Sequence, residues 1–324
     1  MQTRQKTAIR TIAALLCAVL LCAPVLGCGA PKAQSDETLR VVATIFPLYD
    51  WAKNVLGDNP GGASLSLLVQ NGVDLHSYAA TVDDMIMISS CDLFVYVGGE
   101  SDDWVKNVLQ QAKNPDMVAL NLLDVLGDAA KAEELIEGME GEAEEGALDE
   151  HIWLSLKNAS VCTDAIADAL ASLDPTNAES YAANAASYRA KLSALDDAYA
   201  AAVSAAPQKK LLFGDRFPFR YLADDYGLSY YAAFAGCSAE TEASFETILF
   251  LAGKVDALSL HTVLVIDGSD RKIAETVVRS TATQDQAIRS LDSMQSVTQQ
   301  EANAGETYLA VMERNLIVLR DALQ

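Results

Sequence analysis

Apolar runs divide the first half of the chain into short strands that alternate with helices. The strands are predicted at residues 39–45, 65–69, 92–97 and 117–120, and the helices at residues 47–56, 82–90 and 102–112. Strands that alternate with amphipathic helices are typical of parallel βαβ units. The same alternation of strands and helices returns after Pro207. It predicts strands at 210–215, 229–234, 262–267 and 287–291, and helices at 217–226, 245–258, 271–280 and 308–323.

A long helical pattern separates these two halves. After a helix predicted at 158–173, Asp174 can cap a new helix and Pro175 suits its first turn. No further proline occurs before Pro207, so a rod of about 45 Å could join two lobes. An ordinary long surface helix within one domain is the alternative. Its apolar positions recur at steps of three and four residues and are Tyr181, Ala185, Tyr188, Leu192, Leu195, Tyr199 and Val203.

The segment 131–150 is strongly acidic and contains one lysine. Because it has no sustained apolar face, we expect a mobile surface loop or a frayed helix. Its acids could gather cations, or they could form an ordinary solvated run of charge.

The N-terminus has the composition of an export signal. Arg4, Lys6 and Arg10 precede an apolar stretch, 12–21, that is too short for a comfortable membrane span. The following VLGC sequence resembles a bacterial lipobox, which implies cleavage after residue 27 and lipidation of Cys28. Residues 1–27 are then a signal peptide and 28–38 a tether that holds the protein at the extracytoplasmic face of the cell membrane. A plain signal peptide with a chance cysteine is the alternative.

Charge and cysteine content narrow the classes of function. The net charge of −22 becomes −25 if the leader is lost, because its three basic residues leave and no acid does. A chain this acidic is a poor partner for nucleic acid. Besides Cys28, the mature chain keeps Cys91, Cys162 and Cys237. Their number and spacing do not indicate a disulfide scaffold or a zinc–cysteine site, and we expect buried small side chains without chemistry.

Two of the three histidines lie in loops suited to ligand binding. His76 follows the predicted strand 65–69 and precedes a helix start at Thr81, which is the edge of an open α/β sheet where ligands bind. His151 lies next to Asp149 and Glu150. Both histidines suggest a metal site, although loop histidines that only hydrogen-bond to carboxylates would show the same pattern. His261 precedes an apolar strand and is interpreted as structural.

Two aspartates complete a possible ligand set. Asp215 and Asp292 end predicted strands in the second half. If the two halves face each other, these carboxylates and the two imidazoles would converge in one cleft and could bind a divalent cation. Cys237 would lie near that cleft, but we assign it no chemistry.

The chain resembles the solute-binding lipoproteins of zinc and manganese ABC importers over nearly all of its mature length. Residues 72–78, GVDLHSY, resemble the family's GxDPHxY loop, with Leu75 in place of proline. Residues 149–154, DEHIWL, resemble its DPHxWL loop, with Glu150 in place of proline. The family fold is two βα lobes with parallel sheets joined by one long helix. The resemblance therefore implies lobes at 39–173 and 208–324 and a linking helix at 174–207.

The resemblance also implies the ligands. His76 and His151 match the first two, and Asp215 stands in the segment of the third, where zinc-type members carry histidine and manganese-type members glutamate. Asp292 matches a fourth, aspartate ligand, and residues 305–316 resemble the closing helix. Oxygen ligands favour Mn²⁺, yet Zn²⁺ binds such sets intrinsically more tightly. Glu150 is the acidic segment's most plausible metal contact.

The expected function is a monomeric receptor that captures Zn²⁺ or Mn²⁺ and passes it to an ABC permease, without enzymatic activity. A metal-dependent hydrolase is one alternative, with Glu150 or Asp270 as the acid or base. No hydrolase motif supports it. An adhesin-like surface lipoprotein is the other alternative.

Overall fold

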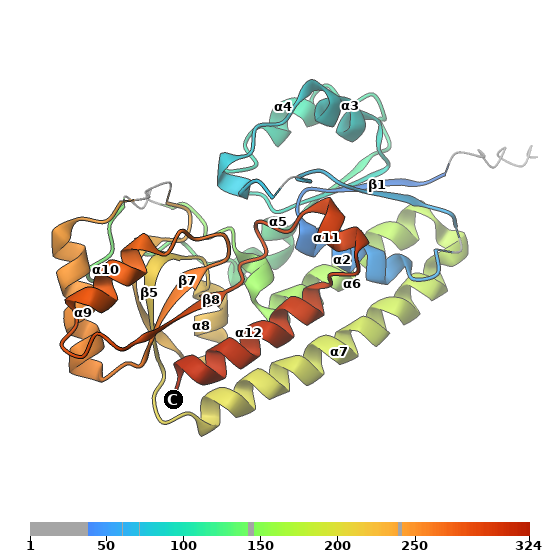
Figure 1. The fold of residues 1–324 in the computed structure, drawn as a ribbon. Coiled ribbons are helices and arrows are strands. Elements are labelled where there is room, and N and C mark those ends of the chain that lie inside the picture. The colour runs from blue at the N-terminus through green and yellow to red at the C-terminus, as the bar shows by residue number, and fades with distance from the viewer. Residues whose placement is uncertain (1–37, 60, 71, 142–145, 239–241) are drawn as a thin grey trace, which may run out of the picture. The chain divides into compact units, whose positions relative to one another are not determined.

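The computed structural model describes residues 38–59, 61–70, 72–141, 146–238 and 242–324. These residues contain two separate four-stranded sheets, both parallel throughout (Figure 1). The predicted fold class is therefore confirmed. The predicted leader 1–27 and the lipidation site Cys28 lie outside the described residues. Within the described part of the chain, none of the helices is both long and apolar enough to span a membrane.

The first sheet has the strand order β2-β1-β3-β4. The chain adds β2 on one side of β1 and then β3 on the other side, while all strands stay parallel. At such a switch point the loops at the carboxyl ends of neighbouring strands lead away in opposite directions and leave room for a ligand. The elements of this lobe are β1 (Arg40–Ala43), α2 (Phe46–Leu56), β2 (Ser64–Leu67), α3 (Val82–Ser90), β3 (Leu93–Tyr96), α4 (Val105–Leu109), β4 (Val118–Asn121), α5 (Leu122–Leu126) and α6 (Leu156–Leu173).

The second sheet repeats the arrangement with the order β6-β5-β7-β8. Its central strands are buried on both faces, as parallel strands covered by helices are. The elements are β5 (Lys210–Phe217), α8 (Arg220–Tyr226), β6 (Ser229–Ala235), α9 (Phe245–Leu258), β7 (Thr262–Ile266), α10 (Lys272–Ser280), β8 (Ala287–Leu291), α11 (Gln299–Asn303) and α12 (Tyr308–Ala322).

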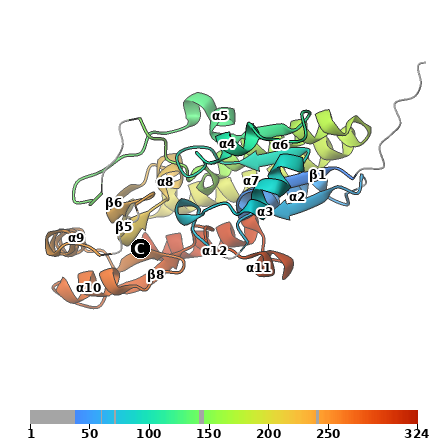
Figure 2. The same ribbon diagram turned by 90° about the horizontal axis from the view of Figure 1, so that it is seen from above.

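The long helix α7 (Ala178–Ala205) connects the two sheets. All seven apolar positions of its predicted stripe are buried, and they are the only residues of α7 that are. At 28 residues its length is about 42 Å. The view from above shows α12 running beside α7 (Figure 2), and the hydroxyl of Tyr199 on α7 donates to the carbonyl of Met312 on α12 at 2.7 Å.

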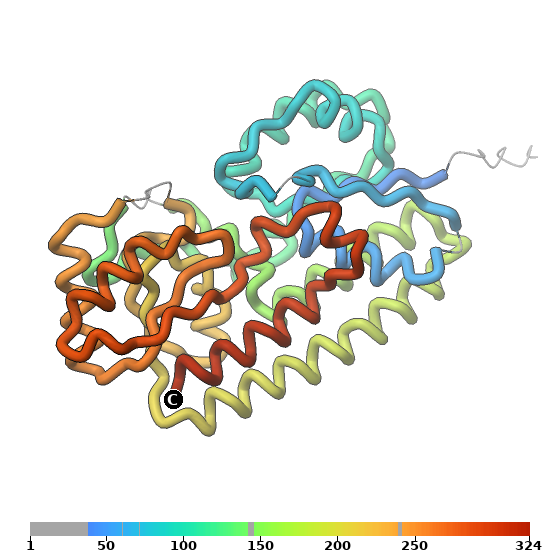
Figure 3. The backbone as a smooth tube through the Cα atoms, in the orientation of Figure 1, coloured from blue at the N-terminus to red at the C-terminus, as the bar shows by residue number. Residues whose placement is uncertain are grey.

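After β8 the chain returns to the first lobe, as the backbone tube shows (Figure 3). The amide of Gln299 donates to the carbonyl of Gln70 at 3.0 Å, and the amide of Tyr308 donates to the buried carboxylate of Asp50 on α2 at 3.1 Å. One continuous apolar core contains residues of both sheets, from Val41 on β1 to Leu291 on β8. The two lobes are thus packed together by shared side chains as well as joined by α7.

The acidic segment forms a loop in its described residues, which is one of its two predicted conformations. Its described residues form no helix. Ala132 pairs with Leu148, and Glu140 pairs with Phe234 on β6. Ion pairs join Glu134 to Arg220 at 3.0 Å and Glu137 to Lys254 at 3.2 Å. The segment is therefore pinned to the second lobe by pairing that its composition alone did not reveal.

Other differences concern the ends of elements. The helix predicted at 217–226 begins only at Arg220, because β5 continues through Phe217. The helix predicted at 102–112 is limited to α4, and the short helices α5 and α11 were not predicted. In contrast, the helix start at Thr81 forms the full capping box with Asp84.

Candidate metal centre

His76 is presented by a short, locally stabilised turn. Leu75–Ser77 form one turn of 3-10 helix after β2, and the carboxylate of Asp74 accepts the amide proton of His76 at 3.0 Å. Leu75, which stands where the family has proline, is 1% exposed and anchors the turn in the core. The loop therefore holds the imidazole in a defined place.

His151 is fully buried and precedes a second 3-10 turn, Ile152–Leu154. The side chains around that turn fix it to the other lobe. The indole of Trp153 donates to the carbonyl of Ser293 at 2.8 Å, and the hydroxyl of Tyr308 donates to the carbonyl of Trp153 at 2.6 Å. The position of His151 thus depends on contacts 140 residues away in sequence.

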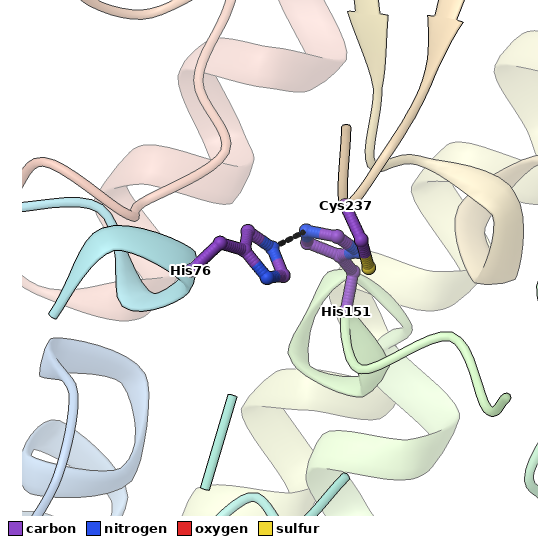
Figure 4. A group of neighbouring side chains, drawn as sticks. All are labelled: His76, His151 and Cys237. Carbon is purple, nitrogen blue, oxygen red and sulfur yellow. Dashed lines mark hydrogen bonds between the residues drawn. The ribbon is translucent and has the colours of Figure 1, made fainter. Parts of the chain in front are cut away.

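The two imidazoles face each other. Figure 4 shows the Nε2 atom of His76 directed at the Nε2 atom of His151, at a distance of 3.1 Å. On the far side of each ring, Nδ1 has its own polar neighbour. The Nδ1 atom of His151 lies 2.9 Å from the carboxylate of Asp149, and the Nδ1 atom of His76 lies 2.8 Å from the hydroxyl of Ser101. Where Nδ1 donates to such a neighbour, a neutral imidazole carries its lone pair on Nε2, where it can bind a metal.

Glu150 lies next to the ring of His76. One carboxylate oxygen, Oε1, accepts the amide proton of Ser101 at 2.8 Å. The second, Oε2, is buried without a hydrogen-bond partner among the described residues and lies 3.4 Å from Nδ1 of His76. Consecutive acids therefore serve different histidines, Asp149 behind His151 and Glu150 behind His76. Because Glu150 approaches Nδ1 and not Nε2, its place is behind the imidazole and not at the metal-binding face.

The electrostatic setting keeps His76 neutral. Burial, reinforced by the neighbouring His151, lowers the pKa of His76 to about 3. A neutral imidazole retains the lone pair that a cation needs. Burial raises the pKa of Glu150, and the hydrogen bonds from Ser101 oppose that shift.

A third side chain that can bind metal lies beside the two histidines. Cys237 follows β6 in the second lobe, and its Sγ atom and one nitrogen from each imidazole lie within 4.8 Å of one another (Figure 4). Burial, with the charges of Asp149 and Glu133, raises the pKa of the Cys237 thiol well above its ordinary value. The sequence interpretation placed Cys237 near the cleft but assigned it no chemistry, and the structure brings its Sγ atom close to both imidazoles.

The two predicted aspartate ligands stand apart from this cluster of three. Asp215 accepts the amide protons of Arg216 at 2.8 Å and Ile266 at 3.4 Å, and it lines a neighbouring pocket with Asp74. Asp292 accepts the amide proton of Met294 at 2.8 Å. Burial raises the pKa of Asp292 to about 6, and the charge of Asp267 adds to the shift. Both aspartates stay predicted ligands.

An ion pair crosses between the lobes next to the site. The Nη2 atom of Arg216 lies 2.7 Å from the carboxylate of Asp74 in the His76 loop. Its Nη1 atom donates to the carbonyl of Ser238 at 3.4 Å, directly after Cys237. Burial would raise the pKa of Asp74, but Arg216 and His76 hold it below its usual value. Arg216 therefore ties the loop of His76 to the loop of Cys237.

This fold and this pair of histidine loops agree with one known family. Residues 41–322 match the model described as zinc-uptake complex component A, periplasmic. The chain belongs to this family. The family is described by its part in uptake and not as an enzyme, in agreement with the expected absence of enzymatic activity.

Curated relatives match more than nine tenths of the chain. The zinc-binding lipoprotein AdcA of Streptococcus pneumoniae serotype 4 is 32% identical over 317 residues, which are 96% of this chain and 60% of AdcA. The high-affinity zinc uptake system protein ZnuA of Bacillus subtilis is 28% identical over 304 residues, which are 91% of this chain and 90% of that protein. The chain thus spans about 60% of the length of the AdcA relative and nearly all of the ZnuA relative.

Solved structures show the same fold. The Zn(II)-bound ZnuA-like domain of S. pneumoniae AdcA is 29% identical, with a TM-score of 0.71 over 89% of this chain and 99% of that domain. The metal-dependent lipoprotein YcdH of B. subtilis is 25% identical, with a TM-score of 0.72 over 89% of this chain and all of that one.

Proposed function

We propose that this protein is the solute-binding receptor of a zinc importer and that it holds Zn²⁺ as cargo between His76 and His151. The observation that carries the proposal is the pair of Nε2 atoms 3.1 Å apart, each on a ring whose Nδ1 atom faces a polar partner. In a tetrahedral zinc site with Zn–N distances of about 2.0–2.1 Å, two nitrogen ligands stand about 3.3 Å apart. The imidazoles are thus spaced as two ligands of one ion.

The chemistry of the donors favours zinc as the cargo. Imidazole nitrogens bind Zn²⁺ more tightly than Mn²⁺ in otherwise equal sites. The relatives AdcA and ZnuA are named for zinc, which supports the same choice. Mn²⁺ is the competing cargo, since carboxylates from Asp215 and Asp292 would make the ligand set harder. Both aspartates accept backbone hydrogen bonds, and a carboxylate that keeps such bonds still has lone pairs for a metal.

The place of the receptor in the cell follows from its N-terminus and its family. We propose that lipid on Cys28 holds it at the extracytoplasmic face of the membrane and that it delivers the ion, as a monomer, to an ABC permease. The lipobox-like VLGC sequence and the lipoprotein name of AdcA support the anchor. The family's description as a component of a zinc-uptake complex supports the permease.

Metal content tests this function directly. The purified full chain should bind one Zn²⁺, measured by mass spectrometry after equilibration with equal Zn²⁺ and Mn²⁺. His76→Ala should lose the ion because one of two imidazoles is gone. His261→Ala is the matched control, since His261 is exposed and immediately precedes β7. A wild-type chain that holds neither ion and shows no thermal shift with either would refute the receptor.

A further inference from the structure

Cys237 lies beside the two histidines of the proposed zinc site. It lies in the loop after β6, and Figure 4 shows its side chain beside the ring of His151. Its Sγ atom and one nitrogen of each histidine lie within 4.8 Å of one another. In a tetrahedral site with Zn–S of about 2.3 Å and Zn–N of about 2.0–2.1 Å, sulfur and nitrogen ligands stand about 3.6 Å apart. The separations of at most 4.8 Å exceed that spacing by no more than about 1.2 Å.

A buried carboxylate behind His76 is compatible with a cation bound at that imidazole. Glu150 is 2% exposed, and its Oε2 atom has no hydrogen-bond partner among the described residues. It lines the same cavity as His76 and Cys237. A buried acceptor left unpaired is costly, and a positive charge on the neighbouring imidazole–metal unit would compensate it.

The other two described cysteines serve as a comparison. Cys91 is 1% exposed and Cys162 is fully buried, and both lie inside apolar clusters. Cys237 is only partly buried and lines a cavity that also contains Glu100, Glu133 and Glu150. The role of a small apolar side chain thus fits Cys91 and Cys162 and does not fit Cys237.

The loop of Cys237 is held in register with the loop of His76. Arg216 reaches the carboxylate of Asp74, two residues before His76, and the carbonyl of Ser238, one residue after Cys237. The amide of Cys237 also donates to the carboxylate of Glu133 at 3.4 Å. These contacts come from three segments and fix the thiol beside the imidazoles.

We propose that Cys237 is a third ligand of the transported ion and that its thiolate makes the site selective for thiophilic cations such as Zn²⁺ over Mn²⁺. When the ion binds, the S–H bond breaks, a metal–sulfur bond forms and the proton passes to solvent. A thiolate is a softer ligand than a carboxylate and binds Zn²⁺ in preference to Mn²⁺. The inference rests on the proposed receptor function, because it assigns a further ligand to the same ion.

Cobalt spectroscopy tests the metal–sulfur bond. The full chain, stripped of metal and kept in detergent, is titrated with Co²⁺, because thiolate-to-cobalt charge transfer gives an intense near-ultraviolet band that nitrogen and oxygen ligands do not give. The wild-type chain and the control Cys91→Ala should develop this band up to one equivalent. Cys237→Ala should lack it and bind Co²⁺ at least about 100-fold more weakly, since even loss of an outer partner costs 10–100-fold.

The outcomes separate this inference from the receptor function. If the wild-type chain binds one Co²⁺ without the band, or if Cys237→Ala keeps the band, the thiolate ligand is refuted and the receptor function stands. If the wild-type chain binds no Co²⁺, both are refuted. Cys237→Asp tests the selectivity, because it supplies a harder anionic ligand at the same place. Its preference for Zn²⁺ over Mn²⁺ should fall at least tenfold, and an unchanged preference would overturn the proposed selectivity.

Discussion

Asp50 lies at the junction of three helices and makes the stability of this protein depend on pH. Its side chain is buried, with 2% of the residue exposed. The carboxylate accepts hydrogen bonds from the hydroxyl of Tyr188 on α7 at 3.3 Å and from the amide of Tyr308 on α12 at 3.1 Å. Burial raises the pKa of Asp50 from the ordinary value of 3.8 to about 6, although these hydrogen bonds oppose the shift. Protonation of Asp50 therefore favours the folded state.

The magnitude follows from linkage. A carboxyl group whose folded pKa is raised stabilises the fold fully below pH 3.8 and loses that contribution as the pH rises through about 6. The whole contribution is about 3 kcal/mol, because each tenfold change in proton affinity is worth about 1.4 kcal/mol. Between pH 5 and pH 7 the group should lose about 1.3 kcal/mol of the free energy of unfolding.

Urea unfolding of the metal-free protein measures this effect. The free energy of unfolding is obtained at pH 5, 6 and 7 for the wild-type chain and for Asp50→Asn, which cannot titrate. Other buried acids, such as Asp102 with a pKa raised to about 7 by its burial, also respond to pH in both proteins. Subtracting the free energy of unfolding of the variant from that of the wild type removes the contribution of these other acids. This difference in the free energy of unfolding should change by about 1.3 kcal/mol from pH 5 to pH 7.

The lost hydrogen bonds of Asp50→Asn add an offset that is the same at every pH, so the test does not depend on it. Asp58→Asn, in the exposed turn after α2, is the matched control and should show no such change. A difference between wild type and Asp50→Asn that stays constant within about 0.3 kcal/mol across this range would refute the proposed burial penalty.

Three further predictions concern the site and its supports. Asp149→Asn should weaken zinc binding about 10- to 100-fold by calorimetry, because His151 exchanges a charged Nδ1 partner for a neutral one, and unchanged affinity would contradict that role. Gly236→Ala would place a methyl group 3.0 Å from Cε1 of His151, so zinc affinity should fall on the order of tenfold. Gly253 has open space around it, so Gly253→Ala should leave zinc affinity unchanged. Thr81→Ala should lower the free energy of unfolding by about 1 kcal/mol in urea, because α3 loses its capping box, and a loss below about 0.3 kcal/mol would show that this cap contributes little.

Local patterns in the sequence were sufficient for the framework of this protein. The stripe of α7 was predicted residue by residue, because the 3.6-residue period of a helix is a property of neighbouring positions. The capping box at Thr81 and the placement of His76 after a strand were also predictable, since each is determined within about ten residues. His151 was found from a short motif of the same kind.

Tertiary structure decided which side chains accompany the two histidines. Cys237 lies 86 residues beyond His151 in the sequence, and only the packing of the second lobe brings its Sγ atom to the imidazoles. The roles of Asp149 and Glu150 behind different rings also depend on where His76 lies relative to them. The acidic segment is held by Arg220 and Lys254, which belong to helices of the second lobe. Contacts of this kind join segments far apart in the chain, and their distances follow from how the two lobes pack and not from any local period.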